Sequence, residues 1–372
     1  MTFVKGFTTG ALTSFACFYV YNSRISTARK KYAEDAESII KQNRVVISSD
    51  DPMLEDVNKL ENQRKILKYG IPDKGPEYNV YENHVLNYDQ ARKIPSWVAE
   101  HITQDKLKGE ANRKHSHFKP DPNLNSKFNA GNDDYLKSGW SRGHMTPAGN
   151  HKYKQTAMND SFYLSNVVPQ NYENNAGFWN RFELYCRDLT KKFKDVRVIT
   201  GPVFLPDLEE SEDKIFIKYQ LIGKRQVAVP THLYKVVIAE SNNNNNNLIA
   251  LGAFIVPNKP IGYDKQLTDF MVPLEILEEK TGLTMLPKLD QSMTKNLCSV
   301  DSCQLMSRDK FELYFIARRL QTAKNLDQLN KIYNEIAEKK LKPDDYLIKL
   351  FKEKEWQLKE KELMGKKHQK EL

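Results

Sequence analysis

The chain has 372 residues, with 57 Lys and Arg against 48 Asp and Glu, and a formal net charge of +9 at pH 7. This length allows one large globular domain of about 200 to 250 residues plus an appendage. The excess of positive charge is typical of proteins that bind a polyanion, either nucleic acid or an anionic membrane. Four unevenly spread cysteines argue against the disulfide framework of a secreted protein.

The N-terminal segment, residues 1–33, contains no Asp or Glu but several Lys and Arg. Its apolar run, residues 7–21, is shorter than the roughly 20 residues that cross a bilayer, although residues 3–22 could span one if Lys5 reached the surface. We predict a mitochondrial targeting segment that doubles as an inner-membrane anchor. A secretory signal peptide is the alternative, and it is disfavoured because no A-x-A cleavage site is evident.

Residues 34–73 are rich in charge and predict a spacer, with a helix that starts after the break at residues 48–52 and runs to residue 67. Aromatic residues become frequent from Tyr78 onward, so the main folded domain is placed at residues 74–296.

The main domain mixes strands with few helices. Residues 94–102 predict a short strand that leads into the basic run 112–119, where His115 and His117 alternate as on one face of a strand. Residues 196–200, 233–240, 249–256 and 268–272 predict further strands, and a helix over 273–281 should end before Gly282. Six asparagines, residues 242–247, predict a long hairpin loop.

Because this order lacks a βαβ rhythm, we predict an α+β domain with a central, mainly antiparallel sheet. Residues 297–372 change to helical periodicity, with helices over 311–320, over 326–336 and from Pro343 onward, and a charged tail that is either solvated helix or disordered. We interpret them as a small C-terminal helical appendage docked on the main domain.

Two residue pairs could suggest a metal site, but neither pattern is complete. His115 and His117 lack a third ligand nearby, so a solvated surface is favoured. Cys298 and Cys303 lack the C-x2-C spacing and the partner pair of a zinc site. Arg113 is the stronger candidate in this region, because an arginine in a cleft can grip a phosphate through two hydrogen bonds.

The stretch richest in candidate catalytic residues begins at residues 139–144, Gly-Trp-Ser-Arg-Gly-His. A glycine beside His144 allows the backbone to approach a substrate closely, and an imidazole suits a general base near neutral pH. Two polar runs follow, residues 162–170 (FYLSNVVPQ) and residues 174–183 (NNAGFWNRFE).

Together these runs resemble the DNA/RNA non-specific endonucleases of the ββα-metal fold. That family has Asp-Arg-Gly-His, then Thr/Ser-Asn-x-x-Pro-Gln, then Asn-x-x-x-Trp-x-x-x-Glu. The resemblance covers residues 78–289. Ser141 in place of the family's aspartate, the segment from Cys298 to Cys303 and the helical extension are similar to the mitochondrial exo/endonuclease members, which extends the resemblance nearly to the C-terminus.

The resemblance implies a role for each matching residue. His144 matches the general base that activates water, Asn175 the sole protein ligand of one Mg2+, Glu183 the carboxylate that orients the metal's waters, and Arg113 the arginine facing the scissile phosphate. Mn2+ can substitute for Mg2+. The implied reaction is hydrolysis of DNA, and possibly RNA, to 5′-phosphate and 3′-hydroxyl products, with 5′-end-directed cleavage.

Further site residues are predicted around this centre. Arg142 is a second catalytic arginine. The predicted substrate contacts are Asn166, Lys152, Arg187 and Phe311, where Phe311 would stack on a terminal base or, alternatively, belong to the core. The resemblance also implies a homodimer.

The helix that carries Glu183 should begin irregularly. Its apolar stripe, Phe178, Phe182, Tyr185, Cys186, Leu189 and Phe193, leaves Glu183 and Arg187 on the flank. Regular helix would set Asn175 about 12 Å from Glu183 along the axis, so either the helix start is irregular or Glu183 acts through water. The alternative is that Glu183 and Arg187 form only an i,i+4 surface pair.

Ser141 removes one negative charge relative to the family pattern, and we expect altered activity rather than its loss. Three alternative functions stay open: an endonuclease without end preference, a catalytically inactive nucleic-acid-binding module of the same fold, and a metal-dependent phosphatase, which mononucleotide competition would distinguish.

Overall fold

The computed structural model describes residues 75, 77–206, 215–243 and 246–368. The predicted targeting segment, residues 1–33, and the spacer with its expected helix, residues 34–73, lie outside these ranges. Among the helices that are described, none combines the length and the apolar character that a passage through a lipid bilayer requires.

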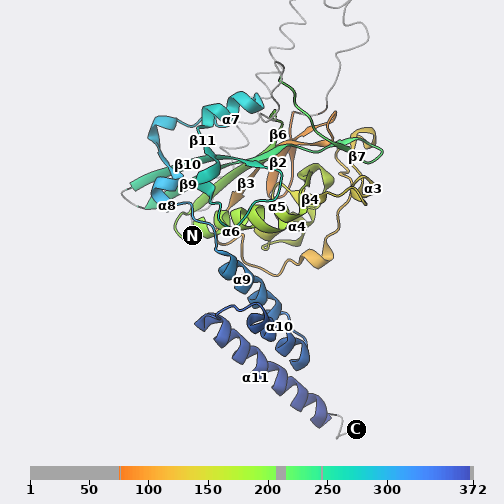
Figure 1. Cartoon of the computed structure of the whole chain (residues 1–372), viewed down its shortest axis with the longest axis vertical. Helices are drawn as coiled ribbons and strands as arrows, with labels where there is room; N and C mark the ends of the chain where they lie inside the picture. The colour runs from red at the N-terminus through yellow and green to blue at the C-terminus, as the bar shows by residue number, and fades with distance from the viewer. Residues whose placement is uncertain (1–74, 76, 207–214, 244–245, 369–372) are drawn as a thin grey trace, which may run out of the picture. The chain divides into compact units, whose positions relative to one another are not determined.

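One eight-stranded sheet forms the centre of the fold (Figure 1). Its strand order is β1-β2-β3-β6-β9-β10-β11, and β12 pairs with β10. The strand pairs are antiparallel except for β10 and β12, which are parallel. The strands are β1 (Asn79–Val80), β2 (His84–Asp89), β3 (Ile94–Ile102), β6 (Asp195–Val203), β9 (His232–Asn243), β10 (Asn246–Pro257), β11 (Met271–Val272) and β12 (Thr294–Asn296). This architecture confirms the predicted α+β class with a mainly antiparallel sheet.

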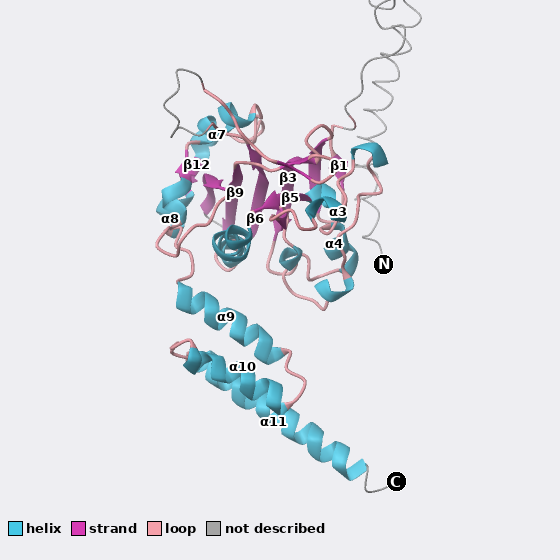
Figure 2. Cartoon of the chain, turned by 45° about the vertical axis from the view of Figure 1, so that its right-hand side comes forward, coloured by secondary structure: helices cyan, strands magenta, loops and turns pink. Residues whose placement is uncertain are grey.

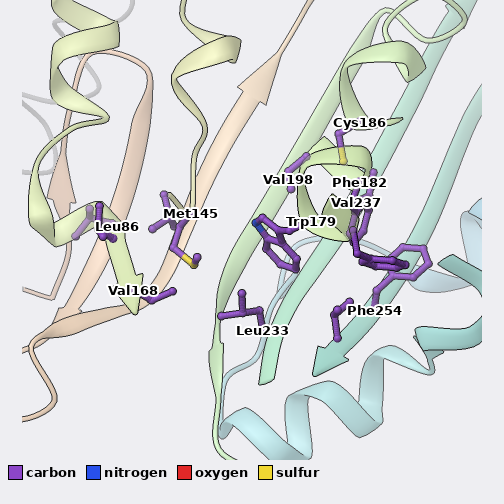
Figure 3. Packing of buried hydrophobic residues seen from close by; sticks show 14 of the residues in the cluster. Leu86, Met145, Val168, Trp179, Phe182, Cys186, Val198, Leu233, Val237 and Phe254 are labelled. Carbon is purple, nitrogen blue, oxygen red and sulfur yellow. The ribbon is translucent and has the colours of Figure 1, made fainter. Parts of the chain in front are cut away.

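The two faces of the sheet bury different cores, because successive side chains of a strand point to opposite sides. Along β9, Val237 and Ala239 belong to the larger core, whereas Val236 and Ile238 belong to a second one. Helix α6 (Asn180–Leu189) packs on the first face, where Figure 3 shows Phe182 beside Val237 and Phe254. Helix α7 (Leu274–Thr281) packs on the second.

Smaller elements complete the main domain (Figure 2). Strands β4 (Ser141–His144) and β5 (Val167–Gln170) form a separate pair, as do β7 (Leu221–Ile222) and β8 (Val227–Ala228). The short helices are α3 (Asn132–Tyr135), α4 (Gln155–Asp160) and α5 (Tyr172–Asn174). Short 3-10 segments lie at Arg113–His115, Ser126–Phe128, Ala148–Asn150, Leu164–Asn166, Leu267–Phe270 and Gln291–Met293.

The predicted strands at residues 94–102, 196–200, 233–240 and 249–256 are confirmed, as is the helix that ends before Gly282. Gly282 adopts φ +68°, the left-handed conformation in which glycine avoids the penalty of a side chain. The predicted stripe of the helix after Gly177 is also confirmed, since its six apolar residues are all buried in the larger core.

Three local predictions are wrong. The basic run around Arg113 is a 3-10 turn instead of a strand, since Asn112 caps it by accepting from the backbone N–H of Lys114, and His115 and His117 are exposed. Residues 267–270 are 3-10 helix, and only Met271–Val272 pair as a strand. The asparagine tract is not a long loop, because β9 and β10 pair as far as Asn243 with Asn246.

The C-terminal segment is helical, as predicted: α8 (Leu297–Asp301), α9 (Arg308–Gln321), α10 (Leu326–Glu338) and α11 (Asp345–His368). Helices α9, α10 and α11 pack against one another (Figure 2). They share a small core of their own, which includes Ile316, Leu329 and Leu347. Cys298 and Cys303 form a disulfide, so their sulfurs are not available to bind zinc. The short separation of the two cysteines gave no sign of that bond.

Two buried histidines of the main domain should make stability depend on pH. Burial, as the main cause, lowers the pKa of His84 and of His151 to about 3. The unfolded chain binds a proton near pH 6.5 at each position, so stability is retained above that pH and falls as the pH decreases from about 6.5 toward 3. Each histidine should cost up to about 1.4 kcal/mol per pH unit in that window.

Urea unfolding between pH 7.5 and pH 4.5 checks this expectation. His84→Phe, which keeps a ring stacked on Tyr81, should flatten the dependence of the unfolding free energy on pH. The same replacement at the exposed His115 serves as the control. Equal slopes in wild type and His84→Phe would contradict the assignment.

Candidate active site

The centre of the site is the β4–β5 pair followed by a helical segment. Ser141 lies opposite Gln170, and His144 lies opposite Val167. Gly143 is required here, because a Cβ at that position would lie 2.1 Å from Oε1 of the buried Gln170. The close approach of the two strands places His144 at the end of β4, directly before the buried Met145.

A cleft of about 990 Å³ opens at this point. The structure brings seven of the predicted site residues to its lining: Arg113, Arg142, His144, Lys152, Asn175, Glu183 and Arg187. They come from β4, the 3-10 turn at Arg113, the loop after Asn150, and the helical segment that ends in α6. Segments far apart in the sequence therefore meet at one surface.

The imidazole of His144 packs against two aromatic rings that also contact each other. Its ring centroid lies 4.9 Å from that of Phe118 and 4.9 Å from that of Phe162. Burial is the main cause that lowers the pKa of His144 to about 3. The nearby Arg113, His151 and Arg142 also lower it. The ring is therefore neutral at pH 7, the form that accepts a proton, and among the described residues its Nε2 has no hydrogen-bond partner.

Asn175 begins an irregular stretch of helix. Residues Asn175–Trp179 form a π-helical turn between α5 and α6, which is the irregular start that the spacing of Asn175 and Glu183 called for. The Nδ2 of Asn175 donates to Oγ of Ser141 at 3.0 Å, and that hydroxyl donates to the carbonyl oxygen of Gln170 at 2.7 Å. Ser141 thus fixes the amide so that Oδ1 is left for another ligand.

Glu183 and Arg187 both line the cleft, so they are not an ordinary surface pair. Burial raises the pKa of Glu183 to about 7, against the opposing effect of Arg187 and Lys235. Nη1 of Arg187 donates to Oδ1 of Asn150 at 2.9 Å. The cleft therefore contains a carboxyl that titrates near neutral pH beside a held guanidinium.

Positive charge surrounds His144. The guanidinium of Arg142 lies 4.4 Å from the centroid of the Phe118 ring and donates to Oδ1 of Asn132 at 2.6 Å. Arg113 lies 5.9 Å from the centroid of Phe162. Burial lowers the pKa of Lys152, and the nearby Arg318 and Arg187 lower it further. Such a concentration of cations suits a polyanion.

The structure does not bring two of the predicted substrate contacts to the cleft. Asn166 is fully buried: its Nδ2 donates to the carbonyl oxygens of Thr146 and Ser161, and its Oδ1 accepts from the backbone N–H of Thr146. It fixes the chain that follows His144. Phe311 is only 5% exposed and packs edge-to-face on Phe315, so its predicted stacking on a base is wrong and the core alternative holds.

Sequence reasoning missed the part of α9 that reaches the cleft. Phe315 and Arg318 line it, about one and two turns beyond the buried Phe311, and so does Thr322, which directly follows α9. Helical spacing from Phe311 would have pointed to these positions, since residues three and four apart share a face. Tyr172, which is 71% exposed, also lines the cleft and was not singled out.

A metal at this site would have to rely on few protein ligands. No group of three or more His, Cys, Asp and Glu residues arranged to hold a metal exists in the ranges that the structure describes. The amide oxygen of Asn175 and the carboxylate of Glu183 are hard oxygen donors, which Mg2+ prefers, and Mg2+ commonly keeps several waters. The residues present therefore fit a largely hydrated Mg2+.

Comparison with known proteins gives two family matches. Residues 62–292 match the DNA/RNA non-specific endonuclease family, and residues 306–354 match the endo/exonuclease (EXOG) C-terminal domain. The chain is 50% identical over 295 residues to "Nuclease EXOG, mitochondrial" of Danio rerio, covering 79% of this chain and 85% of that protein. The protein of the same name in Homo sapiens is 48% identical over 299 residues, covering 80% and 81%.

A solved structure is also similar. The crystal structure of the EndoG/EndoGI complex aligns with a TM-score of 0.57 and 36% sequence identity, covering 63% of this chain and 97% of that chain.

Proposed function

Since the chain belongs to the DNA/RNA non-specific endonuclease family and is a nucleic-acid-hydrolysing, metal-dependent enzyme, we propose that its cleft cleaves DNA, and also RNA, with His144 as the general base. The observation that carries this proposal is the position of His144, which lines one cleft together with Arg113, Arg142 and Asn175.

The residues around His144 have separate roles in hydrolysis. His144 accepts a proton from the attacking water. Arg113 and Arg142 hold the oxygens of the scissile phosphate through charge-assisted hydrogen bonds, while Lys152 and Arg187 bind neighbouring phosphates. Their charges offset the repulsion between the phosphate and an anionic nucleophile.

Asn175 would hold Mg2+, or Mn2+ in its place, as the sole protein ligand. When bound, the ion stabilises negative charge on the phosphate and on the leaving 3′ oxygen. Asn175 would offer Oδ1, because Ser141 holds its Nδ2, and Glu183 would orient the metal's waters. The neutral Ser141 thus performs the positioning where the family pattern has an aspartate, with one negative charge fewer, which supports altered rather than lost activity.

The relatives are named mitochondrial nucleases, and we assign this chain to the mitochondrion as well. The finer proposal is an inner-membrane location through residues 1–33. We further propose a homodimer, as the family resemblance implies. We keep the domain limits proposed from the sequence, a nuclease domain over 74–296 and a helical extension over 297–372, as a proposal. Leu297, Cys303 and Leu305 pack in the larger core of the main domain, so the change of core lies after Leu305 and not at residue 297.

Helix α9 supports a preference for strand ends. Phe315 and Arg318 line the cleft, so the helical extension can limit how far one end of a bound strand extends. We propose that the enzyme cuts near a 5′ terminus and leaves 5′-phosphate and 3′-hydroxyl ends.

Digestion of 5′- and 3′-labelled oligonucleotides, single- and double-stranded, with Mg2+ tests this function. The full chain should release short products from 5′ ends, whereas a chain ending at Ser307 should still nick a circular plasmid but lose the preference for ends. Helices α9 to α11 share their own core, so a chain that ends at Ser307 loses that core as a whole. An unchanged product pattern from a folded truncated chain would exclude the end-limiting role, and competition by mononucleotides would favour a phosphatase.

A further inference from the structure

A buried carboxylate lies beneath the cleft. Glu100, on β3, is 6% exposed. Its Oε2 accepts hydrogen bonds from Oγ1 of Thr146 at 2.7 Å and from Nδ2 of Asn150 at 2.8 Å. A buried carboxylate is costly unless it is paired and hydrogen-bonded, so its neighbours must stabilise it.

The neighbours on one side are oriented toward Glu100. Nδ2 of Asn83 donates to Nδ1 of His151 at 2.7 Å, which leaves the proton of His151 on Nε2. That N–H donates to Oγ1 of Thr146 at 3.0 Å, and the Thr146 hydroxyl donates to Glu100. Burial raises the pKa of Glu100, while Lys235, Asn150 and Thr146 oppose the rise by stabilising the carboxylate.

On the other side, Asn150 connects Glu100 to the cleft. Asn150 is 2% exposed, and its Oδ1 accepts from Nη1 of Arg187 at 2.9 Å. A carboxylate only accepts hydrogen bonds, so Glu100 requires Asn150 to turn Nδ2 inward. The acceptor end of the amide must then face Arg187, whose guanidinium only donates.

The backbone beside Asn150 leaves room for this arrangement. A Cβ on Gly149 would lie 3.3 Å from Nη1 of Arg187, closer than an ordinary van der Waals contact. Gly149 and Arg187 both line the cleft that contains His144. The guanidinium is therefore held between a small residue and a fixed amide.

We infer that Glu100 is a positioning residue that acts through Asn150 to hold the guanidinium of Arg187 in the cleft wall, where it binds a phosphate of the nucleic acid. This inference rests on the proposed function, in which Arg187 contacts a phosphate next to the scissile one. Glu100 itself does not touch the substrate.

The sign of the change in DNA affinity tests the inference. If Glu100 acted only through its charge, Glu100→Gln would tighten binding of a polyanion, because it removes a negative charge under the cleft. If Glu100 positions Arg187, the same change weakens binding, because a glutamine can also donate and no longer fixes the amide of Asn150.

The dissociation constant of a fluorescein-labelled single-stranded oligonucleotide, measured by anisotropy in EDTA, should rise about three- to tenfold in Glu100→Gln and in Asn150→Ala, the factor that corresponds to one hydrogen bond of typical net strength. With Mg2+, KM should rise by a similar factor and kcat should change less. An unchanged or lower dissociation constant in folded variants would overturn the inference. Asn150→Ala keeps the test available if Glu100→Gln does not fold.

A double-mutant cycle separates positioning from general damage to the core. In an Arg187→Ala background, Glu100→Gln should change the dissociation constant less than about twofold, because the held group is gone. Additive effects would contradict the inference. Asp121→Asn is the matched control, since Asp121 is also a buried carboxylate, accepts from Tyr81 and Ser165, and lies outside the cleft lining.

The control should lower the melting temperature without altering the dissociation constant. Because binding is measured without cleavage, a chain that binds DNA but does not hydrolyse it would refute the proposed function while the cycle still decides the role of Glu100.

Discussion

His144→Ala should lower the rate of phosphodiester hydrolysis by about 10²- to 10⁴-fold, the range that a positioned general base contributes. The imidazole is neutral, lines the cleft and has an unpartnered Nε2, whereas an alanine side chain cannot accept a proton. DNA binding should stay nearly intact, because the arginines and Lys152 hold the phosphates. Single-turnover cleavage of a labelled duplex, beside anisotropy in EDTA, measures both quantities.

His117→Ala is the control for this experiment, because His117 is exposed and does not line the cleft. It should retain the wild-type rate. If His144→Ala kept more than about a tenth of that rate, another group would have to act as the base. If binding fell together with cleavage, the loss would reflect damage to the aromatic cage of Phe118 and Phe162.

Asn175→Ala should lower activity at low Mg2+ by a factor comparable to that of His144→Ala, with part of the activity restored by excess metal. The amide oxygen is the proposed protein ligand, and a metal that keeps most of its waters depends strongly on each protein ligand it has. Activity titrated against Mg2+, together with calorimetry of metal binding to the apoprotein, measures the shift in apparent affinity.

Ser141→Ala should have a smaller effect than Asn175→Ala. It keeps Oδ1 of Asn175 but frees Nδ2, so the apparent Mg2+ affinity should fall less than in Asn175→Ala. Equal effects would mean that Ser141 contributes more than orientation. Cleavage that continues in excess EDTA would refute the metal-dependent mechanism for both variants.

The sequence by itself determined the longest strands of the central sheet, the helix of Glu183 and the chemistry of the site. Strands β6, β9 and β10 follow from runs of β-branched residues, and the helix of Glu183 follows from apolar residues at helical spacing, because both patterns are local. The residue types around His144 and Asn175, in that order and spacing, are sufficient to indicate a nuclease family.

Local patterns were less reliable where capping or pairing competes with propensity. Asn112 accepts a backbone hydrogen bond and turns the run at Arg113 into a 3-10 segment, although alternating residues there are typical of a strand. The asparagines of β9 and β10 pair in register although asparagine is a poor strand former, because the ladder below them continues through both strands.

Only the tertiary structure decided which polar residues face the cleft. Asn166 and Asn175 are both asparagines of the polar runs that follow His144. The side chain of Asn166 is enclosed and bonded to Thr146 and Ser161, whereas Asn175 lines the cleft. Phe311 and Phe315 lie one helical turn apart, and packing puts the first in the core and the second in the cleft lining.

The link from Glu100 through Asn150 to Arg187 joins a strand, a 3-10 turn and a helix. No periodicity within one segment could predict it, because hydrogen bonds between segments depend on how the sheet and the helices come together in space, and burial then decides which polar atoms must find a partner.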